Sequence, residues 1–154
     1  MTTETINSFF ESKVPRNWFE RPPTVEFDDD EILVIGTIKS DRPVDAFREE
    51  TRAKRMAIAG DAEARFHRKV SWGVEGDGKR TLFTTASVPV TTRLRFSERT
   101  VLDTLVDAGV ARSRSDALGW CVKLVARHEA EWLTDLRGAL VDVERVRAEG
   151  PTLI

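Results

Sequence analysis

TTRLRF, residues 91–96, is the stretch that decides how the rest of this sequence is interpreted. Side chains of two kinds alternate along it, which is the period-2 pattern of a short β-strand with one exposed and one buried face. The alternation predicts an exposed face made of Thr91, Arg93 and Arg95. The opposite, buried face would carry Thr92, Leu94 and Phe96.

Two helices are predicted after this strand. Ser97 can cap the first helix, whose apolar residues have the spacing of one helix face: Val101, Leu102, Leu105 and Val106. Gly109 supplies the left-handed residue at which many helices end. Ser113 and Asp116 then make an S-x-x-D start, followed by apolar positions at helical spacing: Ala117, Leu118, Cys121, Leu124 and Val125. The predicted order is strand, helix, turn, helix.

With this order, residues 91–125 resemble the ribbon-helix-helix family, the Arc and MetJ type of dimeric DNA-binding repressor. In that family the strand pairs with its twin from a second subunit, and the two-stranded ribbon lies in the major groove. The resemblance implies that the bases are contacted by Thr91, Arg93 and Arg95. It implies a dimer core that contains Leu94 and Phe96, and a DNA phosphate held at the second helix start by Arg112, Ser113, Arg114 and Ser115. The sequence departs from the family where Ser97 takes the place often held by proline, and in the C-terminal location of the module.

Composition sets outer limits on the class of protein. The 154 residues are 40% hydrophobic and 32% charged, which suits one moderate core or two small ones. The longest uncharged, mostly apolar run, residues 32–38, is far shorter than the roughly 18 residues of a membrane-spanning helix. The N-terminus has no basic leader, so we expect a cytoplasmic protein without a membrane anchor. The single cysteine, Cys121, rules out an internal disulfide and a multi-cysteine zinc site.

Charge is distributed unevenly along the chain. The formal net charge is −2, which argues against a uniformly basic nucleic-acid binder. Residues 91–127 nevertheless hold seven basic and four acidic side chains, whereas residues 128–154 hold three basic and six acidic ones. A dimer would double the positive region, which suits modest, strongly salt-dependent DNA binding.

The first 89 residues predict a small α+β domain preceded by a helical segment. Residues 1–24 carry apolar side chains at helical spacing, and this segment would pack on the domain or, less commonly, dock onto a partner. Strands are expected at residues 24–27 and 32–39. The acidic residues 28–31 between them lack the ligand spacing of a calcium loop and indicate a solvated turn.

A charged helix is expected from about residue 42 to residue 69, with Gly60 as a point where it could split. Its polar face has two acid–base pairs in the favourable i, i+4 order, Glu50 with Lys54 and Asp61 with Arg65. A basic cluster on this helix could contact nucleic acid, although a solvated face with local ion pairs is the more usual meaning: Arg52, Lys54 and Arg55.

A hairpin and a helical extension complete the pattern. Strands around residues 70–74 and 81–88 flank a Gly-Asp-Gly turn, and Pro89 then interrupts backbone pairing. An apolar stripe continues past Val125 to Gly150, with a break expected near Gly138. This extension could lengthen a dimer interface, cover the N-terminal domain or bind another protein.

The predicted organisation is therefore α+β: a small N-terminal strand-helix-strand domain, then a ribbon-helix-helix module with a helical extension. Its segments are residues 1–24, 25–89, 90–126 and 127–154.

Few residues are candidates for catalysis. His67 and His128 lie in charged or polar stretches, and no nucleophile-elbow, zinc-protease, P-loop or dinucleotide-binding motif is present. We expect a protein that is not an enzyme and has no catalytic residue, cofactor or metal. The sequence favours a homodimeric, sequence-specific DNA-binding transcriptional regulator of the repressor type, with an antitoxin-like regulator as a subtype. The alternative is a dimeric protein–protein interaction or scaffold protein that uses the same core only for dimerisation.

Overall fold

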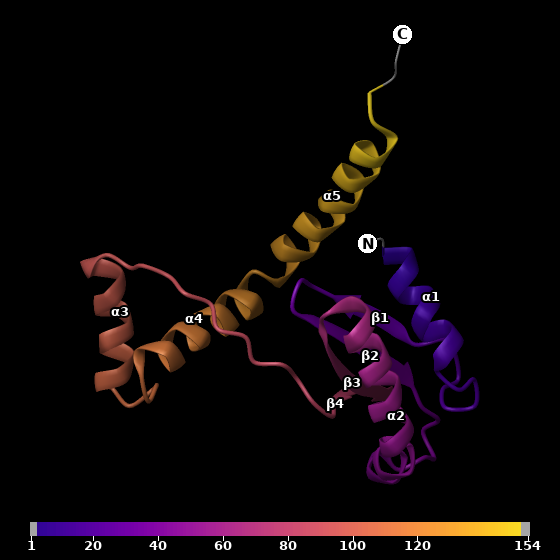
Figure 1. Ribbon diagram of the computed structural model, residues 1–154. Coiled ribbons are helices and arrows are strands. Elements are labelled where there is room, and N and C mark those ends of the chain that lie inside the picture. Colours follow the sequence, from indigo (N-terminus) through magenta and orange to yellow (C-terminus); the bar gives the residue numbers. More distant parts are fainter. Residues whose placement is uncertain (1–2, 152–154) are drawn as a thin grey trace. The chain divides into compact units, whose positions relative to one another are not determined.

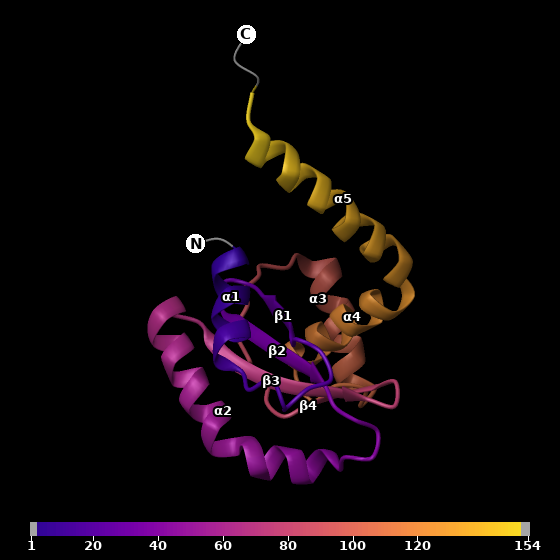
Figure 2. The same ribbon diagram turned by 90° about the vertical axis from the view of Figure 1, so that its right-hand side faces the viewer.

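The computed structural model describes residues 3–151, which form five helices and one four-stranded sheet (Figures 1 and 2). The elements follow in the order α1 (Thr3–Lys13), β1 (Thr24–Phe27), β2 (Glu31–Thr37), α2 (Val44–Phe66), β3 (Lys69–Gly76), β4 (Lys79–Leu82), α3 (Phe96–Asp107), α4 (Arg114–His128) and α5 (Ala130–Glu149). The predicted α+β class is confirmed. The chain divides into two compact units, Met1–Val90 (unit 1) and Thr91–Ile154 (unit 2).

The sheet of unit 1 has the strand order β1-β2-β3-β4. Strands β1 and β2 form the predicted antiparallel hairpin around the acidic turn, where the Asp28 carboxylate accepts the backbone N–H of Asp30 and of Glu31 at 2.9 and 2.8 Å. Strands β2 and β3 are parallel, with Val34 opposite Trp72. A parallel pair needs a long crossover connection, and α2 provides it.

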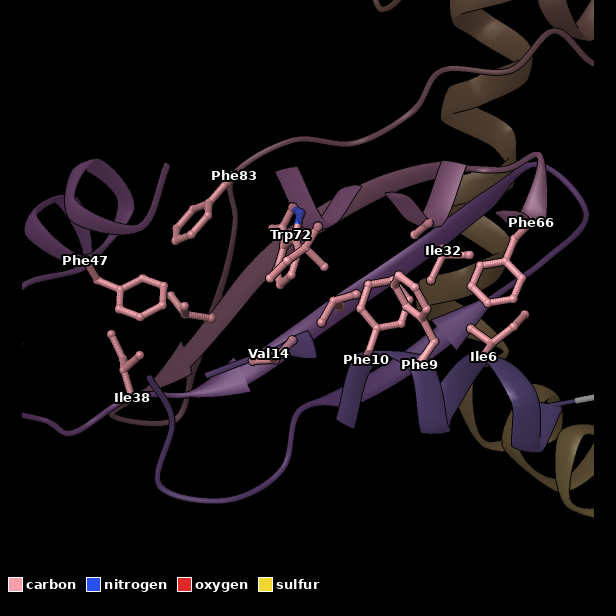
Figure 3. Packing of buried hydrophobic residues seen from close by; sticks show 14 residues of the cluster. Ile6, Phe9, Phe10, Val14, Ile32, Ile38, Phe47, Phe66, Trp72 and Phe83 are labelled. Carbon is pink, nitrogen blue, oxygen red and sulfur yellow. The ribbon is translucent and has the colours of Figure 1, made fainter. Parts of the chain in front are cut away.

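Aromatic side chains dominate the core of unit 1 (Figure 3). Helix α1 packs into this core through Ile6, Phe9 and Phe10, and Val14 directly after it joins them, which confirms intramolecular packing of the N-terminal segment. Phe9 meets Phe66 edge to face at 5.3 Å between ring centroids. At the other end of the cluster, Phe47 of α2 and Phe83 lie 6.2 Å apart. The core therefore runs along the sheet from α1 to the segment that follows β4.

The structure corrects three local expectations in unit 1. Helix α2 continues through Gly60 without a break, because the buried stripe on both sides of Gly60 holds it on the sheet. The two predicted i, i+4 ion pairs are replaced by longer-range ones, Glu50 with Arg42 at 2.8 Å and Asp61 with Lys13 at 3.2 Å. Strand β4 ends at Leu82 rather than near residue 88, because the chain beyond it turns its backbone N–H at Ala86 to the Glu31 carboxylate, at 2.8 Å.

Unit 2 consists of three helices. Helices α3 and α4 meet around a small buried cluster of Leu102, Ala111 and Ala117, with Leu94, Leu105, Val106, Leu118 and Cys121 packed against it. The break predicted near Gly138 is wrong, since α5 runs through Gly138 and the chain leaves helical geometry at Glu129 (φ −112°, ψ 28°) instead. No side-chain contact accounts for this location. None of the described helices has both the length and the apolar character needed to cross a membrane.

We predict that truncating the centre of the aromatic core destabilises the protein strongly. Phe10 is fully buried, and Phe10→Ala should lower the free energy of unfolding by about 3–5 kcal/mol because it removes apolar contacts and leaves a cavity. Met56→Ala, an exposed position on α2, should change it by less than about 0.5 kcal/mol. Urea unfolding of both variants measures the difference. Equal effects would contradict the core described above.

Candidate nucleic-acid interface

The predicted strand at residues 91–96 is absent from the single chain. Residues 83–95 contain no helix or strand, and α3 already begins at Phe96. A ribbon strand requires a second strand for its backbone hydrogen bonds, and none of the described strands pairs with this segment. The expected base-contacting side chains of Thr91, Arg93 and Arg95 are all exposed.

Helix α3 is capped at Arg95 rather than at the predicted Ser97. The Arg95 backbone is extended (φ −80°, ψ 172°), and its N–H donates to the Glu98 carboxylate at 2.7 Å. Glu98 stands three residues after Arg95, which is the spacing at which a carboxylate reaches back to a cap residue. The Arg99 guanidinium also donates to the Leu94 carbonyl at 2.6 Å. These two bonds fix the backbone that precedes α3 while leaving the Arg95 side chain in solvent.

The two residues expected in a dimer core behave differently in the single chain. Leu94 is half-buried and packs against the α3–α4 cluster. Phe96 is 78% exposed, although it is a large aromatic residue at the first position of α3. Several other apolar side chains of α3, of α4 and of the turn between them are also exposed, namely Val101, Val110, Trp120, Val122 and Val125. Unit 2 therefore presents a large apolar surface around a very small buried core.

The turn between α3 and α4 follows the sequence pattern closely. Gly109 adopts the left-handed conformation (φ 75°), and the N–H groups of Val110 and Ala111 donate to the Leu105 carbonyl. Ser113 caps α4, because its hydroxyl accepts the Asp116 N–H at 3.1 Å. Both of these predictions are confirmed.

The residues expected at a DNA phosphate are partly engaged within the chain. Arg114 makes two hydrogen bonds to the Asp103 carboxylate, at 2.7 and 2.8 Å, and these bonds link α4 to α3. Arg112 approaches Asp116 at 3.5 Å but is almost fully exposed. No hydrogen bond involves the backbone N–H of Arg114 or Ser115 in the described part of the chain, as is usual in the first turn of a helix. A phosphate could bind these two N–H groups, whereas binding the Arg114 side chain would require it to leave Asp103.

The Asp103–Arg114 pair makes the stability of unit 2 dependent on pH. The hydrogen bonds from Arg114 hold the pKa of Asp103 below its ordinary value. A lowered folded-state pKa stabilises the protein above the unfolded pKa of about 4, and this stabilisation is lost as the pH falls through the folded value.

We predict that Asp103→Asn lowers the thermal unfolding midpoint near neutral pH, by roughly a few degrees because the pair is exposed. The difference from the unmodified protein should vanish on acidification below the folded pKa of Asp103. Far-ultraviolet circular dichroism across a pH series measures both effects. Asp107→Asn is the matched control, an exposed carboxylate on the same helix without an ion pair among the described residues. A pH-independent loss in Asp103→Asn would count against the ion pair as its cause.

Helix α5 contributes a second exposed apolar surface. None of its side chains is buried, and Leu133, Leu136, Leu140 and Val143 recur at the 3-4-3 spacing of a coiled-coil seam. Trp132, Ala139 and Val146 flank this seam at intervals of seven residues. We call these seven residues the α5 seam. A helix of this kind normally pairs with another helix.

The two histidines considered for catalysis lie in different units. His67 is the C-terminal cap of α2 in unit 1, and His128 ends α4 in unit 2. Among residues 3–151, no three His, Cys, Asp or Glu side chains are grouped as metal ligands would be. Cys121 is half-buried beside the α3–α4 cluster.

One arginine that the sequence placed on a solvated helix face is instead buried. Arg55 of α2 is only 5% exposed and is the only charged side chain buried among the described residues. Its position was detectable, because it falls between Thr51 and Ile58 on the stripe that faces the sheet. The pattern was missed because arginine is rarely buried without a partner.

Two family models match the chain. Residues 4–82 match the N-terminal domain of the Rv1265-like proteins, and residues 95–147 match the Mb1296 C-terminal domain. Neither description names a ribbon-helix-helix family. The uncharacterized protein Rv1265 of Mycobacterium tuberculosis is 52% identical over 157 residues, covering 94% of this chain and 70% of the relative. The uncharacterized protein Mb1296 of Mycobacterium bovis gives the same values. No solved structure matches the chain significantly. The chain therefore belongs to the Rv1265-like family.

Proposed function

We propose that the protein is a homodimeric, sequence-specific DNA-binding transcriptional regulator, in which residues 91–96 of two copies pair as a ribbon that enters the major groove. The observation that carries this proposal is the position of Arg93 and Arg95. Both are exposed, and they lie directly before the helix pair α3 and α4. Side chains in the first turn of α3 fix the Leu94 and Arg95 backbone.

A second copy of the chain would supply the apolar burial and the strand pairing that unit 2 lacks on its own. Its fully buried cluster contains only three residues, too few to stabilise three helices on their own. Pairing two copies of residues 91–96 would satisfy their backbone groups and cover Phe96 at the same time.

The side chains on the exposed segment suit base recognition. An arginine can donate two hydrogen bonds to O6 and N7 of guanine, and each such pair is worth about 1–3 kcal/mol of base discrimination. The free N–H groups of Arg114 and Ser115 would hold a phosphate at the start of α4. Arg112, which is exposed and only loosely paired, adds a positive charge beside them.

We predict that Arg93→Ala combined with Arg95→Ala abolishes sequence preference. Selection from random duplex DNA should yield a two-fold symmetric site with the unmodified protein, and mobility shifts should then show at least about tenfold less preference in the double variant. The control is Arg127→Ala with Arg137→Ala, which removes two exposed arginines from unit 2 outside the segment. If selection with the unmodified protein yields no preferred two-fold symmetric DNA site, the proposal is overturned.

An antitoxin-like regulator is the subtype in which unit 1 or α5 also holds a protein partner. The exposed α5 seam supports such a role, because its apolar side chains lack a partner within the described chain. The same seam favours the second candidate function, a dimeric interaction or scaffold protein that does not read DNA.

Sequence preference in DNA binding separates these two functions, because both use the same dimer core. Phe96→Ser should weaken dimerisation in either case, because Phe96 would lie in the ribbon-side dimer core, and in the regulator it should weaken DNA binding as well. Leu136→Glu with Leu140→Glu, which would place two charges in the α5 seam, should weaken dimerisation only if the seam lengthens the dimer interface. Light scattering measures the mass of each variant, and circular dichroism verifies that each remains folded.

A folded monomer for the unmodified protein would contradict both functions. A dimer that is weakened by Phe96→Ser, in a protein that shows no sequence-specific DNA binding, would favour the scaffold. Binding to DNA with a steep salt dependence and no preferred sequence would support the same conclusion.

A further inference from the structure

Three arginines on α2 form a group with no negative partner. Arg48, Arg52 and Arg55, which we call the α2 arginine cluster, recur at spacings of four and three residues and so lie along one side of the helix. Arg48 and Arg52 are exposed, whereas Arg55 is buried. In residues 3–151 none of the three forms an ion pair. Arg42, near the start of the same helix, is by contrast paired with Glu50.

The surroundings of Arg55 satisfy its hydrogen bonds but not its charge. Its guanidinium donates to the Thr51 hydroxyl at 3.0 Å and to the Arg48 carbonyl at 2.8 Å. It also stacks on the Phe83 ring, 4.8 Å from the centroid, and Arg48 approaches the same ring at 5.6 Å. Burial, followed by the charges of Arg48 and Arg52, lowers the pKa of Arg55. The charge of Glu49 acts in the opposite direction and raises this pKa, but Glu49 forms no ion pair with Arg55 among the described residues.

The fold does not require an arginine at this position. An unbranched apolar side chain such as methionine could follow the same path along Phe83. The Thr51 hydroxyl would remain satisfied, since it donates to the Phe47 carbonyl at 2.7 Å. A buried charge without a counter-charge is unfavourable, and an apolar replacement of similar volume is often neutral or stabilising. A guanidinium that is buried without a counter-charge in the described chain points to an anion that arrives from outside the chain.

The chemistry of the cluster favours a phosphate group. Three guanidinium groups offer many N–H donors in the planar geometry that matches phosphate oxygens. Phe83 is buried and already stacked with Arg55, so its ring is not free to stack on a base. The cluster therefore suits the charged backbone of a nucleic acid rather than its bases.

Chain length ties this cluster to the proposed DNA site. Arg93 lies ten positions after Phe83, and ten residues span at most about 35 Å. One turn of B-DNA is about 34 Å. The connecting segment therefore limits a phosphate bound by the cluster to about one turn from the bases contacted by Arg93.

We propose that the α2 arginine cluster binds a backbone phosphate of the DNA that flanks the recognised site, an inference that rests on the proposed function. Unit 1 then contributes affinity that is independent of sequence, while residues 91–96 supply base recognition. Arg48 and Arg52 contact the phosphate oxygens, and Arg55 supplies the buried charge behind them.

The exposed members of the cluster provide the first test. Arg48→Gln with Arg52→Gln in the full chain should weaken binding to duplex DNA equally for preferred and unrelated sequences. The slope of log K against log salt concentration should become shallower by about 2 per chain, because two fewer phosphates are neutralised. Arg65→Gln with Lys69→Gln is the matched control, since it removes two exposed charges about 20 Å further along α2 or just beyond it. The control should leave the slope unchanged.

The buried member provides a second test that a purely structural role would fail. Arg55→Met should leave the unfolding midpoint in chloride buffer unchanged or higher, and it should lower DNA affinity. A lower midpoint with unchanged affinity would show that Arg55 only supports the fold, and would overturn the inference.

The outcomes distinguish this inference from the proposed function. If the cluster variant loses affinity while Arg93→Ala with Arg95→Ala keeps sequence preference, the phosphate site stands and the assignment of base-contacting residues is wrong. If the cluster variant matches its control while the Arg93 and Arg95 variant loses preference, the phosphate site is wrong. Absence of DNA binding by the unmodified protein overturns both.

A final comparison separates backbone phosphate from free phosphate. Unfolding midpoints are measured in inorganic phosphate and in chloride at equal ionic strength, for the unmodified protein and for Arg55→Met. Stabilisation by phosphate that requires Arg55, together with loss of DNA affinity in the cluster variant, supports the proposal. The same stabilisation with unchanged DNA affinity identifies a free anion as the ligand and overturns the assignment to DNA.

Discussion

The parallel pairing of β2 with β3 is the constraint on which the rest of unit 1 depends. Two consecutive parallel strands cannot be joined by a tight turn, so the 23-residue helix α2 must cross between them. That crossing lays one stripe of α2 against the sheet, where Phe47 and Phe66 join the aromatic core at its two ends (Figure 3). The same stripe includes position 55, so a guanidinium is carried into contact with Phe83 by the path of the helix. Core and charge cluster are consequences of one topological requirement.

Unit 2 differs from unit 1 because its helices are well capped but bury few apolar side chains. Ser113 and Glu98 satisfy helix termini, and Asp103 with Arg114 joins α3 to α4. These local bonds define each helix, yet few apolar side chains lie between them. Exposed apolar area of this extent normally marks an interaction surface. The helices of unit 2 are therefore specified by their own sequence, with little apolar burial within the described chain.

The sequence predicts features governed by neighbouring residues better than features governed by distant ones. The β1–β2 hairpin, the Gly109 turn and the Ser113 cap follow from residue types within a few positions, and the structure has all three. The start of α3 was predicted two residues too late, because the prediction took the Ser97 hydroxyl as the cap. In the structure the Glu98 carboxylate instead accepts the Arg95 backbone N–H, so Arg95 is the cap residue. Glu50 pairs with Arg42, and Asp61 pairs with Lys13. The periodicity of α2 cannot predict these pairs, because both partners lie outside the helix. Burial of Arg55 likewise depends on Phe83, 28 positions later. The ribbon proposed at residues 91–96 would need a strand from a second chain, and a single sequence does not show whether that strand is present.

Glu129, the single non-helical residue between α4 and α5, is a hinge about which α5 can rotate as a rigid rod. Glu129 keeps a hydrogen bond on each side, from its N–H to Val125 and from Leu133 to its carbonyl, so the helices on both sides stay intact up to this residue. The direction of α5 is then set by two backbone dihedral angles. Because a 20-residue helix is about 30 Å long, a rotation of about 20° at Glu129 moves its far end by about 10 Å. A small change in the Glu129 dihedral angles can thus move the α5 seam by several ångströms toward a partner helix. The α3–α4 pair does not have to change.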